Sequence, residues 1–252
     1  MTRLNTKFTR IYINGYDVSG TVRSAGERGA KVALPSASAY SDAVENTVGG
    51  KANIVCGPLN AFLSPSAAIG LHELMSSGNV VSDVMIPDSS ISEPVLGDPV
   101  FAYRMMSAEY KANGEDIVGV NISLPDAAYN AGNKYLPMGY LLHPKGSETG
   151  ANTAAGVDFG AQTLTGGWLM YQIFSITGTG TVTITIDHAA VSTYAALTGA
   201  TSGAIATATA PCSGIITLPG DLTIDKKTRW QIAFGASATA CSFALAFIRN
   251  IN

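Results

Sequence analysis

The chain has 252 residues, a length at which folding buries roughly 70% of the surface of the unfolded chain, so a stable core requires neither disulfides nor a metal. Charged residues make up 13% of the sequence, against about 25% in a typical soluble domain, and such a composition suits a surface covered by neighbouring molecules. The formal net charge of −3 argues against a nucleic-acid binder that works by neutralising phosphates.

The first third of the chain predicts short strands and one helix. A strand over residues 8–14 leads into a turn with Gly15 and Asp17 as its turn residues, and a second strand over 52–56 is expected to end at the Gly-Pro pair that follows it. Residues 66–77 place apolar side chains at partly helical spacing before a Gly-Asn pair, so we expect a short helix there. Residues 80–86 predict another strand.

Residues 100–124 contain the strongest hairpin pattern of the first half. Two alternating runs flank a polar turn in which Asn113 and Gly114 supply the positive φ angles of a tight turn. Each arm is long enough for eight or more residues. A long hairpin at a sheet edge exposes unpaired backbone groups, so we expect another chain to pair with it.

The composition changes between residues 125 and 165, where Gly, Asn, Pro and Ala dominate and little periodicity remains. Beyond this stretch charged residues become sparse. The shift predicts two domains: an N-terminal domain over residues 1–135, a junction over 136–165 and a C-terminal domain over 166–252.

The C-terminal region alternates as β-strands do. Residues 168–177 are apolar or aromatic at nearly every position, which predicts a strand with protein on both faces, and residues 181–187 alternate Thr with Val or Ile. The Gly- and Thr-rich residues between these runs predict a turn. Further alternating runs cover residues 205–210, 214–218, 228–234 and 242–248. Several short strands with turns between them predict a mostly β protein with a sandwich or jelly roll.

No group of residues shows the pattern of a catalytic or metal site. Asp187, His188 and Ser192 are the residue types of a catalytic triad, but adjacent strand residues face opposite sides and no Gly-x-Ser-x-Gly turn is present. Residues 221–225 contain too few oxygen ligands for calcium. The basic residues within 226–229 suit a phosphate or, as the acidic balance favours, a solvated loop. We expect neither an enzyme nor a cofactor.

The three cysteines, Cys56, Cys212 and Cys241, lie far apart without metal-ligand spacing. An odd number cannot pair completely within one chain, so we expect small buried hydrophobic residues in a reducing compartment. The N-terminus lacks the apolar segment of a signal peptide, and the long uncharged stretches alternate like strands. We therefore expect neither a signal peptide nor a membrane span.

Residues 11–24, IYINGYDVSGTVRS, resemble the opening of phage tail-tube-like proteins, in which a strand leads into a Gly-Tyr-Asp-Leu/Val-Ser-Gly element. The order of short strands, a helix and a long hairpin is similar as well. Residues 166–188 and the ending FALAFIRN resemble the β-sandwich modules that phage virion proteins append. The resemblance implies a tail-tube-like β-sandwich or barrel domain with one short helix and a long hairpin, followed by a jelly-roll-like C-terminal β-sandwich.

The resemblance further implies a structural virion protein whose copies join into stacked rings, the phage tail tube, which conducts DNA. The rings would be hexameric, or trimeric if the C-terminal half is a second tube-like copy instead of an outer decoration. The implied partners are other copies, other tail proteins and passing DNA, and the implied location is the virion tail, assembled in the host cytoplasm.

In that family the long hairpin contributes to the barrel around the lumen. The hairpin residues expected between subunits are Phe101, Tyr103, Met105, Tyr110, Asn113, Gly114, Ile117 and Val120. The candidate lumen charges are Glu109, Glu115 and Asp116, although an exposed turn accounts for the last two equally well.

Two other functions stay open on the sequence. The C-terminal sandwich would also serve another virion component, such as a capsid decoration protein or a tail-tip or fibre adhesin. A carbohydrate-binding β module would use exposed aromatic side chains, although core packing is the commoner reason for an aromatic residue in an apolar strand. The candidate aromatic residues are Trp168, Trp230, Tyr171 and Tyr194.

Overall fold

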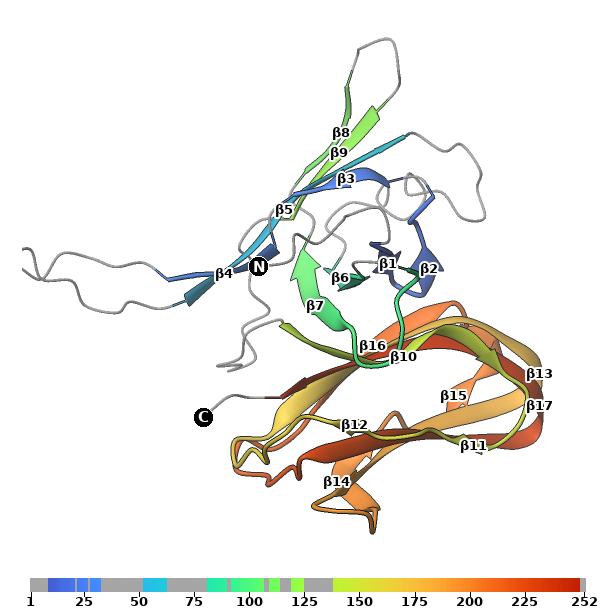
Figure 1. The fold of residues 1–252 in the computed structure, drawn as a ribbon. Coiled ribbons are helices and arrows are strands. Elements are labelled where there is room, and N and C mark those ends of the chain that lie inside the picture. Colours follow the sequence, from blue (N-terminus) through green and yellow to red (C-terminus); the bar gives the residue numbers. More distant parts are fainter. Residues whose placement is uncertain are drawn as a thin grey trace, which may run out of the picture.

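The computed structural model describes residues 9–20, 22–26, 28–32, 52–62, 81–89, 92–106, 109–113, 119–124 and 138–249. Within these ranges the chain is almost entirely β-strand and forms two antiparallel sheets, here called sheet A and sheet B (Figure 1). The mostly β fold class is therefore confirmed. The helix predicted over 66–77 lies outside the described residues.

Sheet A has twelve strands, and its main path runs in the order β14-β13-β17-β10-β7-β6-β1-β2. The remaining strands are short and pair with either β13 or β17. The strands of sheet A are β1 (Tyr12–Ile13), β2 (Tyr16–Asp17), β6 (Val81–Pro87), β7 (Pro99–Met106), β10 (Met138–Glu148), β11 (Asn152–Thr153), β12 (Val157–Asp158), β13 (Gly167–Ala189), β14 (Ala195–Thr201), β15 (Ile205–Ala206), β16 (Cys212–Thr217) and β17 (Lys227–Arg249). One turn of 3-10 helix, η2 (Thr207–Thr209), follows β15.

The longest strands, β13 and β17, pair with each other from Gly167 opposite Arg249 to Ala189 opposite Lys227. The turn predicted between residues 177 and 181 is therefore wrong, because β13 continues through it. Likewise, the runs 228–234 and 242–248 are parts of the one strand β17. Two register shifts interrupt the pairing, and in Figure 1 both strands curve there, so that each contributes to two layers of a sandwich. Bulges of this kind increase the local bend of a strand pair.

Glycine makes this bend possible. Gly178 has φ +98°, and a Cβ added to it would lie 2.0 Å from the carbonyl oxygen of Ser237. On β17, Ala236, which pairs with Gly180, also has a positive φ of 53°. The Gly and Thr residues that predicted a turn thus lie at a bend within a continuous strand. A turn and a strand bend both need the backbone freedom of glycine, so the sequence pattern is the same for both.

The layer formed by the first half of β13, the second half of β17 and β10 is buried on both faces. Alternate residues point to two separate cores. One core receives Trp168, Met170, Ala244, Ala246 and Ile248, and the other receives Leu169, Ile173, Phe243, Leu245 and Phe247. This double burial confirms the expectation of protein on both faces for residues 168–173, whereas Ser175 and Thr177 are exposed.

The first core lies between this middle layer and strands β1, β6 and β7. Its largest buried side chains from those strands include Ile13, Met85 and Phe101, which are fully buried. The second core lies between the middle layer and the lower layer in Figure 1, which holds β11, β12, β14 and the other halves of β13 and β17. The body of the molecule is thus three layers of strands around two cores.

Strand β10 falls inside the stretch predicted as a junction between domains. It pairs with β7 on one side and with β17 on the other, so it joins strands from both halves of the chain into one sheet. The division into two domains stays a prediction, but residues 138–148 of its proposed junction are part of the central sheet.

Sheet B consists of β3 (Val22–Ala25), β4 (Arg28–Val32), β5 (Ala52–Phe62), β8 (Glu109–Asn113) and β9 (Gly119–Leu124). Its order is β3-β5-β9-β8, and β4 pairs with the other end of β5. Figure 1 shows β4 and the β8–β9 hairpin extending away from the three-layered body. The strand predicted over 52–56 continues past Gly57-Pro58, where the pairing with β9 shifts register, because a proline within a strand is tolerated at a bulge.

The predicted hairpin over 100–124 is divided between the two sheets. Residues 109–113 and 119–124 form a hairpin, with Glu109 opposite Ser123 and Asn113 opposite Gly119. The first part of the expected arm is instead β7, which pairs with β6 and β10 in sheet A. The arms are therefore shorter than expected, because alternation alone does not show where a strand changes its partner.

Candidate functional site

Strands β1 and β2 are joined by a two-residue turn formed by Asn14 and Gly15, whose φ angles are 51° and 84°. Positive φ at both turn residues is the geometry that a tight primed hairpin requires, and Asn-Gly is the favoured pair for it. The turn predicted at Gly15 is confirmed, whereas Asp17, also predicted as a turn residue, lies in β2, and Asn14, predicted as the end of the strand, lies in the turn. This hairpin begins the Gly-Tyr-Asp-Val-Ser-Gly element singled out in the sequence.

The tip of this hairpin is inserted against the middle layer. The Gly15 N–H donates to the Gln172 Oε1 at 2.6 Å, and the Gln172 Nε2 donates to the carbonyl oxygen of Asp83 at 2.8 Å. A Cβ on Gly15 would lie 2.4 Å from the backbone nitrogen of Cys212. Only glycine therefore fits both the turn and the close approach to β16.

A buried carboxylate anchors the same region. Asp83 on β6 accepts hydrogen bonds from the Arg104 Nε at 2.6 Å and Nη2 at 2.9 Å, and from the Ser213 Oγ at 2.8 Å. Its backbone N–H donates to the Asn14 Oδ1 at 2.8 Å. Because the buried charge is paired and hydrogen-bonded, this network holds β1, β6, β7 and β16 together.

Beside the hairpin, the surface forms a groove of two adjoining cavities of about 510 and 350 Å³. Both cavities are lined by Arg10, Asp17 and Lys145, so they form one continuous depression. The larger cavity is completed by Gly15, Tyr16, Ser19, Gly20, Phe174 and Pro211, and the smaller one by Tyr12, Glu93 and Pro94.

The charges in the groove form two ion pairs. The Lys145 Nζ lies 2.6 Å from the Asp17 Oδ2, and Arg10 pairs with Glu93 through its Nε and Nη2. Asp17 also accepts a hydrogen bond from the Ser19 Oγ at 2.5 Å.

The pairing is reflected in the pKa values of the groove. Burial alone would raise the pKa of Asp17, but the hydrogen bonds from Lys145 and Ser19 outweigh it and lower that pKa. The hydrogen bond to Glu93 raises the pKa of Arg10. The carboxylate of Asp17 and the guanidinium of Arg10 are therefore favoured in their charged forms.

Two register shifts shape the floor of the groove. The pairing of β13 with β17 shifts between Ile173 and Ser175, which leaves Phe174 as an extra residue whose ring meets Tyr12 edge-on at 5.0 Å. The pairing of β10 with β17 shifts between His143 and Gly146, in the segment that carries Lys145. The Lys145 Nζ then lies 4.9 Å from the centre of the Phe174 ring. Bulges of this kind re-aim side chains out of the regular pleat.

Sequence reasoning identified the hairpin of the groove but not the groove itself. Arg10, Glu93, Lys145 and Phe174 come from four separate parts of the chain, and none lies in a recognisable motif. Phe174 breaks no visible alternation, since it lies in a mostly apolar run. The only available hint was the Gly-Tyr-Asp element, which contains Asp17.

The residue types of a triad do not come together. Asp187 accepts hydrogen bonds from Arg229 at 2.9 and 3.0 Å and from Gln231, while the His188 Nδ1 faces Asp225 and accepts its backbone N–H at 3.2 Å. The two side chains therefore point to opposite sides of β13, as expected for neighbours in a strand.

The basic cluster at residues 226–229 is not the solvated loop that the sequence predicted. Lys227 and Arg229 belong to β17, where they lie 4.0 Å from Asp158 and 2.9 Å from Asp187. The acidic partners of Lys227 and Arg229 are distant in the sequence, so strand pairing alone brings these side chains together.

Two of the candidate sugar-binding aromatic residues are core residues. Trp168 and Trp230 are 2% and 4% exposed, so neither offers a surface ring. The guanidinium of Arg229 covers the ring of Tyr194 at 4.1 Å, and Tyr171 is partly buried. Core packing therefore accounts for both tryptophans, as the apolar strands around them favour.

Trp230 also belongs to a buried aromatic cluster in the second core. The ring of His143 stacks on Phe243 at 4.0 Å and meets Trp230 edge-on at 4.6 Å. His143 further contacts the carbonyl oxygen of Phe243 at 3.0 Å and Glu148 at 3.2 Å. Burial lowers the pKa of His143 despite these partners, so the neutral imidazole is favoured.

The cysteines agree with the expectation of buried, unpaired thiols where the structure describes their side chains. Cys241 is fully buried and free, and burial raises its pKa to about 12. Cys212 is free and partly buried. An inert, protonated thiol is a packing group and not a nucleophile.

The predicted hairpin residues are distributed over both sheets. Phe101 and Tyr103 are buried in the first core, so these two side chains fill the subunit's own interior. Met105 lies on β7, whereas Glu109, Tyr110, Asn113 and Val120 lie on β8 and β9. Gly114, Glu115, Asp116 and Ile117 lie outside the described residues. A contact between subunits stays a prediction for the hairpin residues of sheet B.

A search of the described ranges finds no cluster of three or more His, Cys, Asp or Glu side chains able to hold a metal ion. The same ranges contain no helix long and apolar enough to cross a membrane.

Comparison with known proteins gives only distant likenesses. No protein-family model and no curated protein matches the chain. Among solved structures it is similar to the Dit (gp 19.1) protein of phage SPP1, described as a hub adsorption apparatus of phages that infect Gram-positive bacteria, with 11% identity, a TM-score of 0.35 and coverage of 98% of this chain and 100% of that one.

Two further solved structures are similar to a lower degree. The match to a chain of Sulfolobus turreted icosahedral virus has 12% identity, a TM-score of 0.23 and coverage of 99% of this chain and 84% of that one. The match to infectious bursal disease virus strain Gx has 13% identity, a TM-score of 0.25 and coverage of 99% and 70%. With TM-scores this low, none of the three likenesses decides what this chain does.

Proposed function

We propose that this chain is a structural protein of a virus particle, and that its copies associate through sheet B into the stacked rings of a phage tail tube. Its proposed partners are other copies of itself and other tail proteins, and DNA passes through without being bound. The observation that carries the proposal is the open arrangement of sheet B. The resemblance of residues 11–24 to tail-tube-like proteins supports it independently.

The edge strands of sheet B have a partner strand on one side only, in the part of the chain that the structure describes. Within the described residues, its strands pair only with one another, so β8 at one edge and β3 and β4 at the other each have a partner on one side. The unpaired backbone groups of such edges are a template for pairing with another chain. A ring in which the β8 edge of each subunit meets the opposite edge of the next would satisfy all of them and would close on itself.

The charge of the hairpin suits a conduit for DNA. Glu109 lies on β8, and Glu115 and Asp116 belong to the connection between β8 and β9. If the hairpins line a lumen, these carboxylates repel the phosphates of passing DNA. Affinity for DNA arises mainly from neutralised phosphates, so an acidic lining would let it slide.

The test is electron microscopy of the purified protein together with its mass in solution. We expect rings or tubes in negative stain and a molecular mass several times that of one chain. A protein that stays monomeric at high concentration would contradict the proposal. Closed clusters that never stack would instead indicate another virion component, such as a decoration protein or an adhesin.

A pair of proline variants tests the β8 edge. In an antiparallel strand, successive N–H groups point alternately toward the partner and away from it, so either Lys111 or Ala112 directs its N–H outward from β9. We therefore expect either Lys111→Pro or Ala112→Pro to abolish assembly while the subunit keeps its unfolding temperature. The exposed Val191 lies between β13 and β14 of sheet A and is not part of sheet B. Val191→Ala is therefore the control expected to assemble normally.

A further inference from the structure

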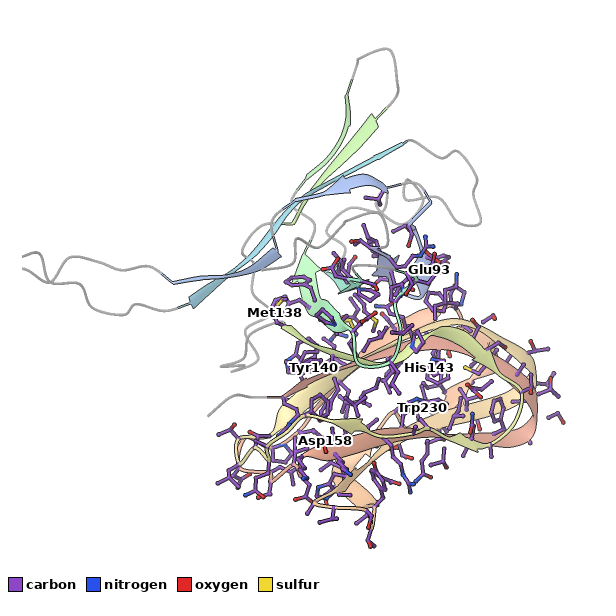
Figure 2. All side chains as sticks on the ribbon, viewed as in Figure 1. Glu93, Met138, Tyr140, His143, Asp158 and Trp230 are labelled. Carbon is purple, nitrogen blue, oxygen red and sulfur yellow. The ribbon has the colours of Figure 1, made fainter. Side chains whose placement is uncertain are left out.

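The groove beside the β1–β2 hairpin has the features of a ligand site. Its two cavities have volumes in the range of small-molecule sites, and its residues come from β2, β10, β13 and the segments around Arg10, Glu93 and Pro211. The view with side chains shows Glu93 on the hairpin side of the body, away from His143 and Trp230 inside the sandwich (Figure 2). The groove thus lies at the edge of the first core, which contributes Tyr12 to its lining, and away from the second core.

Among the described residues that line the groove, the charges are balanced. Arg10 and Lys145 each pair with a carboxylate, and the exposed fractions of the four side chains range from 26% for Asp17 to 62% for Glu93. An anion placed here would approach Asp17 or Glu93, and a cation would approach Arg10 or Lys145. A charged ligand would therefore be repelled by at least one side chain of like charge, so the groove favours a neutral ligand.

The hydrogen-bonding groups suit hydroxyls in particular. The Lys145 ammonium has three N–H donors, and the carboxylates of Asp17 and Glu93 accept several hydrogen bonds each. A hydroxyl group donates and accepts at once, so it can bridge Lys145 and Asp17 without separating their 2.6 Å pair.

The groove also contains an aromatic surface. Phe174 is partly buried against the first core, the Lys145 ammonium lies over its ring and Tyr12 meets it in a T-shaped contact. A pyranose ring presents apolar C–H groups on its faces and hydroxyls around its rim, which matches an aromatic ring surrounded by charged hydrogen-bonding groups.

We propose that this groove binds a neutral saccharide, with its hydroxyls between Lys145, Asp17 and the Arg10–Glu93 pair and one ring against Phe174. The volumes of the two adjoining cavities leave room for more than one sugar unit. The site belongs to a single subunit and lies on sheet A, so it does not depend on the proposed assembly through sheet B.

Three neutral trisaccharides, maltotriose, cellotriose and chitotriose, are the probes, and saturation-transfer NMR followed by calorimetry is the measurement. We expect at least one to bind with a Kd of about 1 mM or tighter. Glucuronic acid and glucosamine carry opposite charges on the same ring, and we expect both to bind more weakly than neutral glucose.

Two variants connect binding to the groove. Gly20 lines the larger cavity, has open space around its Cβ position and lies outside the left-handed region, so Gly20→Trp adds a ring there without backbone strain. Gly150 has the same properties away from the groove, and Gly150→Trp is the matched control. Lys145→Met keeps the aliphatic stem beside Phe174 and removes the donor.

We expect Gly20→Trp and Lys145→Met to weaken saccharide binding by about tenfold or more, while Gly150→Trp binds as the original protein does. Circular dichroism and the unfolding temperature establish that each variant is folded. Absence of binding by all three trisaccharides would overturn the proposal, as would equal binding by folded Lys145→Met and the original protein. Assembly is measured by microscopy and saccharide binding by NMR and calorimetry, so the failure of one proposal would not be mistaken for the failure of the other.

Discussion

The two sheets of this protein differ in how much of their faces and edges is covered by the same chain. In sheet A, the middle layer of β13, β17 and β10 is covered on both faces and paired on both sides by strands of the same chain. In sheet B, the described strands leave the outer edges of β3, β4 and β8 without a partner strand. Both sheets have strand-forming sequences, and they differ in how far strands of the described chain cover their edges.

This difference separates stability from assembly. Changes in the middle layer should alter the free energy of unfolding of one subunit, because two cores depend on that layer. Changes at the edge of β8 should alter the association of subunits and leave the isolated subunit nearly as stable as before. The following predictions test that separation.

The largest effect is expected from Phe247, which is fully buried in the second core. Phe247→Ala should lower the free energy of unfolding by about 3–5 kcal/mol, because it removes buried apolar surface and leaves a cavity. Denaturant titration of the subunit measures this change. The exposed Val191 supplies the control: Val191→Ala should remain within about 0.5 kcal/mol of the original protein.

Asp83 should have the next largest effect. Asp83→Ala removes the partner of Arg104 and the acceptor of Ser213, and we expect a loss of about 3 kcal/mol in unfolding free energy. The value lies at the low end for a broken buried pair because the Arg104 side chain is 28% exposed. Ser213→Ala, which removes one hydrogen bond, should cost about 1 kcal/mol. Similar losses for both variants would show that the ion pair is unimportant.

The bend of β13 depends on Gly178. Gly178→Ala should cost about 2 kcal/mol, because the backbone has positive φ and the new Cβ would collide with the carbonyl of Ser237. Gly203 also has positive φ but open space around it, so Gly203→Ala isolates the conformational part of the cost. Equal unfolding free energies for the two variants would contradict the role of the close approach.

His143 should make the body sensitive to acid. Burial lowers its pKa in the folded state, so the unfolded chain binds the proton more readily, and stability falls as the pH drops below the unfolded value of about 6.5. The contribution is at most about 1.4 kcal/mol per pH unit. We expect unfolding free energies measured at pH 7.5, 6.5 and 5.5 to fall more steeply for the original protein than for His143→Phe. Parallel slopes would assign the acid sensitivity to other groups.

The smallest effect on the subunit is expected from Tyr110 on β8. Tyr110→Ala should change the unfolding free energy of the dilute subunit by less than about 1 kcal/mol but should reduce assembly seen by light scattering. If this substitution destabilised the subunit as much as Phe247→Ala does, the hairpin would belong to the subunit's own core and the comparison of the two sheets would fail.

Patterns local to the sequence predicted much of the fold. The turn at Gly15 and the burial of residues 168–173 on both faces are present in the structure. Burial on the two faces can be read from the sequence because successive side chains of a strand point to opposite faces. The opposite orientations of Asp187 and His188 follow from the same rule.

Features that depend on distant partners were not predictable in the same way. Glycine and threonine residues around Gly178 indicate a turn or a bend equally well, and only the pairing of β13 with β17 distinguishes the two. The same holds for residues 100–124, whose first part pairs with β6 and β10 instead of continuing the hairpin. The groove combines Arg10, Glu93, Lys145 and Phe174 through such pairings and through two bulges.

By itself, the sequence determined that this protein is built from strands, where most of them lie and which of their residues face inward, because period and backbone preference are local properties. The tertiary structure decided which strands are neighbours, that two long strands bend through two layers, and that charges far apart in the chain meet in one groove. Those outcomes depend on the free energy of burying whole faces against one another, which no short stretch of sequence contains.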